Sequence, residues 1–116
     1  MRVDAVVFIG LPNLPEPPTA VFATNDGLAV AMMRGAQGMG LKVPEQLSVV
    51  GFDDNPIGVQ SSPTLTTLRQ PLAAMAEEAA RLLIGIIEGE LVPVKTHLFE
   101  SALIVRGSTM RRESRG

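Results

Sequence analysis

The sequence predicts an α/β fold, an open parallel sheet with flanking helices. Short apolar runs that end at glycine or polar residues occur at 6–9, at 20–24 and from residue 47 onward. Apolar residues recur at helical spacing in the stretches 28–39 and 72–88. The resulting order of strand, strand, helix, strand, helix and strand favours parallel pairing through crossover helices.

Composition excludes several classes of protein. The 116 residues suffice for one domain with a core, and 46% hydrophobic residues against 19% charged residues argue against disorder. A net charge of -2 gives no electrostatic footprint for nucleic acid, and the lack of cysteine excludes disulfides and thiolate zinc sites. We therefore expect no cofactor and no metal. Asp4 makes the N-terminus a poor secretory signal and no apolar run could span a membrane, so we expect a cytoplasmic protein.

The first predicted helix, at 28–39, follows directly from the strand at 20–24. Asp26 is well placed to cap it, and Gly40 is the expected residue just beyond its end. One apolar stripe suits the core. A second stripe, with Val30 and Met33, suggests packing against something outside the domain, and a subunit contact is our hypothesis for it.

The remaining stretches complete the expected order of elements. Residues 55–63 are predicted to be irregular, 65–68 a short extended segment, and 94–105 a region with a further strand. Pro71 is expected to open the second helix and Gly89 to end it, because proline is tolerated in a first turn and glycine is common after a last one. The basic tail at 110–116 is expected to be frayed.

The organising stretch is LSVVGFDD at 47–54, a buried strand that ends in two carboxylates. Asp53 follows this strand as Asn25 follows the one before it, and ligands bind at the carboxyl ends of strands in open α/β sheets. If the two strands are neighbours, an amide and a carboxylate share one crevice and suit a hydroxyl-rich or amine-bearing small molecule. The alternative is that Asn25 only supports a turn, Asp26 caps the helix and Asp53 begins a solvated turn.

No set of residues indicates an enzyme. Asp53 and Asp54 are adjacent on a predicted strand, so they point to opposite faces and cannot act as an acid/base pair. The sequence contains neither a G-x-S-x-G elbow nor a P-loop, and the single histidine, His97, lacks metal-spaced carboxylates. We therefore expect a binding protein without catalytic residues.

Three motifs, PTAVFATND, GLKVPEQLSVVGFDD and PTLTTLRQPL, follow one another at characteristic spacings. In these the chain resembles the lac-repressor (LacI/GalR) family of transcription regulators over residues 19–109. The resemblance implies a periplasmic-binding-protein-like fold with two lobes around an effector cleft, of which this chain holds one incomplete lobe. It implies that Asn25 and Asp53 contact a sugar or nucleoside-like effector, most simply a carbohydrate, and that Leu72 faces it. It also implies a homodimer with contacts at Val30, Met33, Arg34 and Ser61.

The chain also departs from this family. Such regulators bind DNA through a helix-turn-helix domain, which these 116 residues lack, so we expect a single partial effector-binding domain without DNA binding of its own. Residues 1–18 form an atypical leader in which 3–10 resembles a strand of the other lobe. The family packs the helix at 72–88 in that lobe, so we expect its apolar face here to be exposed or swapped. The alternative function is one lobe of a periplasmic-type sugar-binding transport protein.

Overall fold

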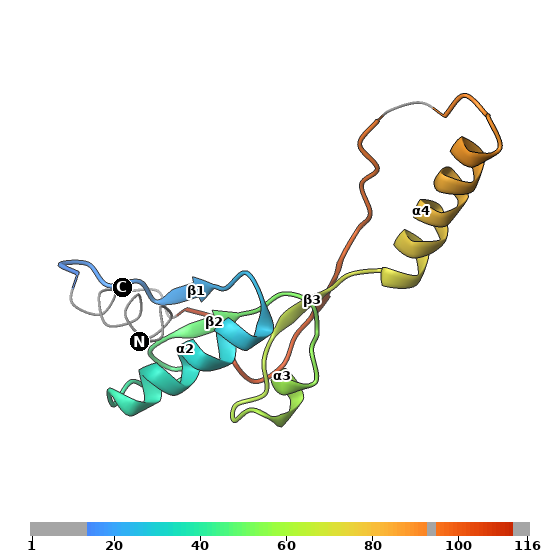
Figure 1. Cartoon of the computed structure of the whole chain (residues 1–116). Helices are drawn as coiled ribbons and strands as arrows, with labels where there is room; N and C mark the ends of the chain where they lie inside the picture. Colours follow the sequence, from blue (N-terminus) through green and yellow to red (C-terminus); the bar gives the residue numbers. More distant parts are fainter. Residues whose placement is uncertain (1–13, 93–94, 113–116) are drawn as a thin grey trace, which may run out of the picture. The chain divides into compact units, whose positions relative to one another are not determined.

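The computed structural model describes residues 14–92 and 95–112 (Figure 1). The predicted strand at 6–9 and the end of the basic tail lie outside these residues. The described elements are, in order, β1 (Ala20–Phe22), α2 (Asp26–Gly38), β2 (Ser48–Val50), α3 (Ile57–Gln60), β3 (Thr67–Arg69), α4 (Leu72–Ile87) and β4 (Ala102–Ile104).

Strands β1 and β2 pair in parallel, with Phe22 opposite Val50. Beyond β2 the chain runs beside the start of β3, because the Gly51 N–H donates to the Thr66 carbonyl at 2.9 Å and a parallel bridge joins Val50 to Thr66. Strand β3 pairs with β4 in a second two-stranded sheet. The prediction of parallel pairing is confirmed, and the carboxyl end of β2 lies between two parallel neighbours.

Burial differs between the first two strands. Val49 at the centre of β2 is fully buried, as expected for an apolar run inside a sheet. In β1, by contrast, Ala20 is exposed and Phe22 is 60% exposed. The apolar run predicted as a strand at 20–24 is therefore not buried throughout, because β1 lies at the edge of the sheet within the described residues.

Helix α2 is covered on two sides by the chain itself. It contacts both β2 and α3, and Val30 and Met33 are each 1% exposed in the core that also holds Val49 and Leu65. The inference that the second apolar stripe packs outside the domain is wrong, because these two side chains have no surface to offer another subunit. Helix α3, in a segment predicted to be irregular, supplies part of this unexpected cover.

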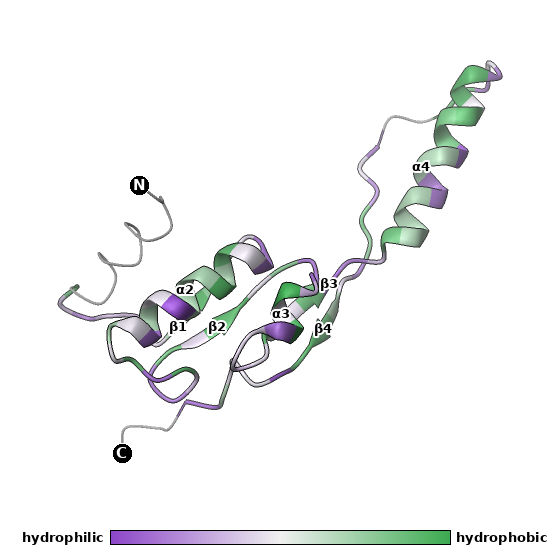
Figure 2. Cartoon of the chain, turned by 60° about the horizontal axis from the view of Figure 1, so that its bottom comes forward, coloured by the Kyte–Doolittle hydropathy of each residue, from purple (hydrophilic) through white to green (hydrophobic). Residues whose placement is uncertain are grey.

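Residues Gln70–Ala102 form the second of two compact units of the chain. Within it, α4 ends before Gly89, whose φ of +82° suits the glycine predicted there. Figure 2 shows the mainly apolar character of this helix. Its side chains Leu83, Ile84, Ile86 and Ile87 are 54–74% exposed, and the exposed or swapped packing expected for this helix stays a prediction. No helix in the described part of the chain is long and apolar enough to cross a bilayer.

Candidate functional site

Asn25 begins the site as the N-cap of α2. Its backbone is extended, with φ −155° and ψ 165°, and its Oδ1 accepts a hydrogen bond from the Leu28 N–H at 2.8 Å. Asp26 is therefore the first helical residue and not the cap, which corrects the sequence prediction. The capping atom is the side-chain amide oxygen of Asn25, an exposed residue that follows β1.

Asp26 is a buried carboxylate, 1% exposed, that joins three segments. Its Oδ1 accepts from the Thr67 hydroxyl at 2.6 Å, and its Oδ2 accepts from the Asn55 N–H at 2.5 Å. A Cβ on Gly51 would collide with the same carboxylate, so only glycine fits there. A negative charge in the first turn of α2 is also favoured by the helix dipole.

Asp53 and Asp54 form a left-handed turn, with φ values of 110° and 59°. Non-glycine residues rarely adopt such angles, and each costs about 1–3 kcal/mol, which contacts with the surroundings must offset. The Asp53 N–H donates to the Leu68 carbonyl at 2.8 Å, which holds the entry of the turn against β3. Asp53 itself is exposed at this edge.

The carboxylate of Asp54 is held by two arginines. Arg69 Nε donates to its Oδ2 at 2.7 Å, and Arg106 Nη2 donates to its Oδ1 at 2.8 Å. The hydrogen bond from Arg106, followed by that from Arg69, lowers the pKa of Asp54 below its ordinary value of 3.8. Only 12% of the Asp54 side chain is exposed, so this residue anchors the turn to β3 and to the segment after β4.

Asn25 and Asp53 lie at corresponding places on adjacent parallel strands. Each is three residues beyond the paired Phe22 and Val50. The two segments stay hydrogen-bonded beyond the strands. The Ala23 N–H donates to the Val50 carbonyl at 2.8 Å, and the Asp26 N–H donates to the Phe52 carbonyl at 3.1 Å. The two segments predicted to share a binding edge are thus neighbours, and both residues are exposed on it.

The other predicted site residues lie elsewhere. Leu72, 62% exposed, begins α4 in the second unit, and its role toward an effector stays a prediction. Arg34 is exposed on α2, whereas the half-buried Ser61 donates its hydroxyl hydrogen bond within its own loop, to the Gly58 or Pro63 carbonyl. The sequence prediction missed Thr67 and Arg106, which local spacing could not reveal.

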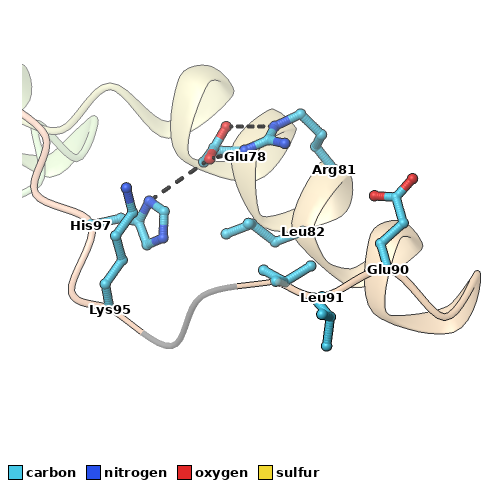
Figure 3. A pocket seen from close by; sticks show the side chains of 8 residues that line it. Glu78, Arg81, Leu82, Glu90, Leu91, Lys95 and His97 are labelled. Carbon is cyan, nitrogen blue, oxygen red and sulfur yellow. Dashed lines mark hydrogen bonds and ion pairs between the residues drawn. The ribbon is translucent and has the colours of Figure 1, made fainter.

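The second unit contains a cavity of about 240 Å³ between α4 and the segment that follows it (Figure 3). Two of its polar side chains face the Glu78 carboxylate: Arg81 donates to it at 2.6 Å, and His97 Nδ1 lies 3.7 Å from it. Ligand pockets usually measure about 300–1,000 Å³, so this one is the weaker candidate. Among the described residues, no group of three acidic or histidine side chains could hold a metal ion.

Comparison with known proteins decides the family. The periplasmic binding protein-like domain matches residues 3–109, nearly the whole chain. The chain belongs to this family. This match confirms the periplasmic-binding-protein-like fold predicted above, of which the chain holds an incomplete part. It also confirms the resemblance to lac-repressor-type regulators.

Relatives of this periplasmic binding protein-like chain are transcription regulators. The repressor CytR of Escherichia coli K12 is 42% identical over 97 residues, which are 84% of this chain and 28% of CytR. A LacI family regulator from Bifidobacterium animalis subsp. lactis superposes with a TM-score of 0.83 at 31% identity, over 91% of this chain and 39% of that one. The regulator CelR in complex with cellobiose gives 0.81 at 34% identity, over 90% and 32%. The chain thus spans less than half the length of each.

Proposed function

We propose that this chain is the effector-binding part of a LacI-type transcription regulator, with the edge at Asn25 and Asp53 as its half of the ligand site. The observation that carries the proposal is the parallel register of β1 and β2, which places the segments of Asn25 and Asp53 side by side. An amide and a carboxylate at the carboxyl ends of parallel strands suit a ligand that presents several hydroxyl groups.

The proposed effector is a carbohydrate or a nucleoside-like molecule. The superposed regulator CelR is described in complex with cellobiose, which supports a sugar. In this chain the carboxylate of Asp53 would accept hydrogen bonds from sugar hydroxyls, and the Asn25 amide would add a donor while its oxygen caps α2. The role of Leu72 toward the effector stays a prediction from the family resemblance.

Isothermal titration with cellobiose, sucrose and adenosine tests this function. Asp53→Asn should weaken the binding of whichever compound binds by about tenfold, since a hydrogen bond to a charged acceptor contributes about 1.5–3 kcal/mol. The matched control is Glu45→Gln, which neutralises an exposed carboxylate three residues before β2, at its opposite end. Binding by the wild type that neither variant alters would contradict the proposed site.

We also propose a homodimer in the cytoplasm, with Arg34 and Ser61 near its interface. These residues belong to one surface region, because Gln37, one turn beyond Arg34, donates to the Ser62 carbonyl at 2.9 Å. DNA contact would need a helix-turn-helix domain from elsewhere in the protein. Sedimentation of the wild type and Arg34→Glu tests the dimer, and a wild-type monomer at high concentration would contradict it.

The alternative function is one lobe of a sugar-binding transport protein, which would use the same edge. The reading frame immediately upstream distinguishes the two. A helix-turn-helix there supports the regulator, whereas a secretion signal there supports transport. The named relative CytR is a transcriptional repressor, which favours the regulator.

A further inference from the structure

We propose that Asp26 is a positioning residue, whose buried carboxylate fixes the left-handed turn that presents Asp53 and couples that turn to Asn25. The inference rests on the proposed function for its meaning in ligand binding. Its conformational part stands on contacts within the folded chain and can be tested without any ligand.

The turn needs external support. Two successive non-glycine residues with φ of 110° and 59° do not adopt these angles by themselves, so surrounding contacts must impose them. The entry of the turn is held by the hydrogen bond from Asp53 N–H to the Leu68 carbonyl. Its exit is held by the hydrogen bond from Asn55 N–H to Asp26 Oδ2, at 2.5 Å.

Asp26 can impose this geometry because it is itself immobilised. Its other oxygen accepts from the Thr67 hydroxyl at 2.6 Å, and Thr67 is fully buried at the start of β3. The same hydroxyl oxygen accepts a hydrogen bond from the Asp54 N–H at 3.4 Å, so the middle of the turn is also held by the Asp26–Thr67 pair. Gly51 packs directly against the Asp26 carboxylate, so any larger side chain at position 51 would displace that carboxylate.

Asp26 also links the two proposed ligand contacts. It directly follows Asn25, and its own N–H donates to the Phe52 carbonyl at 3.1 Å, next to Asp53. Asp26 thus connects the segment after β1 to the turn after β2, through its backbone N–H and through its side chain. A ligand held by Asn25 and Asp53 would meet a preorganised pair, which reduces the ordering cost of binding.

The first test is hydrogen exchange on the wild-type chain, followed by NMR of two variants. The Asn55 amide should exchange at least about tenfold more slowly than an unstructured amide, although Asn55 is exposed. Positions 53 and 54 should give the strong intraresidue amide–Hα cross-peaks of positive φ. Asp26→Asn retains an acceptor and should keep these cross-peaks, whereas Asp26→Ala should lose them.

A suppressor makes the test specific. In the double variant Asp26→Ala with Asp53→Gly, glycine adopts a positive φ without strain, so the cross-peak at position 54 should return. An unprotected Asn55 amide in the wild type would overturn the proposal. So would a folded Asp26→Ala that keeps both cross-peaks. The exchange measurement decides the matter even where Asp26→Ala does not fold.

The second test is cellobiose affinity. Asp26→Asn should bind within about threefold of the wild type, and Asp26→Ala should bind at least about tenfold more weakly. If the wild type does not bind cellobiose while the cross-peaks change as expected, the sugar assignment fails and the positioning role stands. If the wild type binds cellobiose and Asp26→Ala binds it equally well, the positioning role fails and the proposed function stands.

Discussion

Asp26 and Thr67, 41 positions apart in the chain, are joined by a buried hydrogen bond of 2.6 Å. Asp26 is 1% exposed and Thr67 is 0% exposed, so water cannot replace either partner. The bond ties the first turn of α2, which Asn25 caps, to the start of β3, whose Leu68 carbonyl accepts from the Asp53 N–H.

Thr67→Val should destabilise the fold by about 1–3 kcal/mol, because it leaves a buried carboxylate oxygen without its donor. Urea denaturation measures the change. Thr67→Ser keeps the hydroxyl and should cost less than Thr67→Val. Thr24→Val, at an exposed position after β1, is the matched control and should stay within about 0.5 kcal/mol of the wild type. Equal effects at positions 67 and 24 would show that the buried bond contributes nothing.

Gly51→Ala should destabilise the protein by about 1–3 kcal/mol, since the added methyl group meets both the Asp26 carboxylate and the Leu65 side chain. Gly38→Ala is the opposite case. A Cβ there meets nothing within 4 Å at the end of α2, so this variant should stabilise by about 0.4–1 kcal/mol. Thermal unfolding of both variants gives the comparison. A Gly51→Ala protein as stable as the wild type would contradict the packing described around Asp26.

Acid should weaken the anchor of the turn. The hydrogen bonds from Arg106 and then Arg69 lower the pKa of Asp54 below 3.8, so the folded state favours the ionised form. Its stabilisation is present above the unfolded pKa and disappears as the pH falls through the folded pKa. Between neutral pH and about pH 3, wild-type unfolding free energy should fall more than that of Asp54→Asn. An equal acid slope for the two proteins would rule out this contribution.

The two arginines should differ in importance. The Arg106 side chain is 17% exposed and also donates to the Leu65 carbonyl at 3.1 Å, whereas that of Arg69 is 57% exposed. Exposed ion pairs contribute little, so Arg106→Met should destabilise the fold more than Arg69→Met. Urea denaturation of the two variants tests the order, and a larger loss for Arg69→Met would contradict it.

The apolar face of α4 should drive self-association of the isolated chain. Leu83 and Ile87 are 58% and 74% exposed, and contiguous apolar patches on soluble proteins usually mark contact surfaces. The double variant Leu83→Glu with Ile87→Glu should sediment as a smaller species than the wild type at the same concentration. Glu77→Gln, on the polar side of α4, is the control. A wild-type chain that stays monomeric at high concentration would refute exposed or swapped packing as a source of association.

Part of this structure follows from local sequence pattern. The ends of β1 and β2 could be located because apolar runs stop at Asn25 and after Gly51, and parallel pairing then puts Asn25 and Asp53 on one edge. The role of Asp26 could not be predicted in the same way. Asparagine and aspartate both cap helices, and the buried position of Asp26 depends on Thr67, which is 41 residues away.

Two further features depend on distant partners. Arg106 is 52 positions from Asp54, and no spacing rule connects residues so far apart. Val30 and Met33 indicate a second apolar face on α2, but the pattern does not say whether another subunit or the same chain covers it. The cover comes partly from α3, four residues in a segment whose proline, serine and glycine content indicated irregular structure.

The most direct test is an NMR titration of the labelled chain with cellobiose, followed at every backbone amide. The account predicts that the largest shift changes cluster at residues 25–28 and 52–55, on the shared edge of β1 and β2. Changes that cluster instead around His97 and Glu78, in the cavity of the second unit, would contradict it. A spectrum that no concentration of cellobiose alters would refute cellobiose as a ligand of this edge.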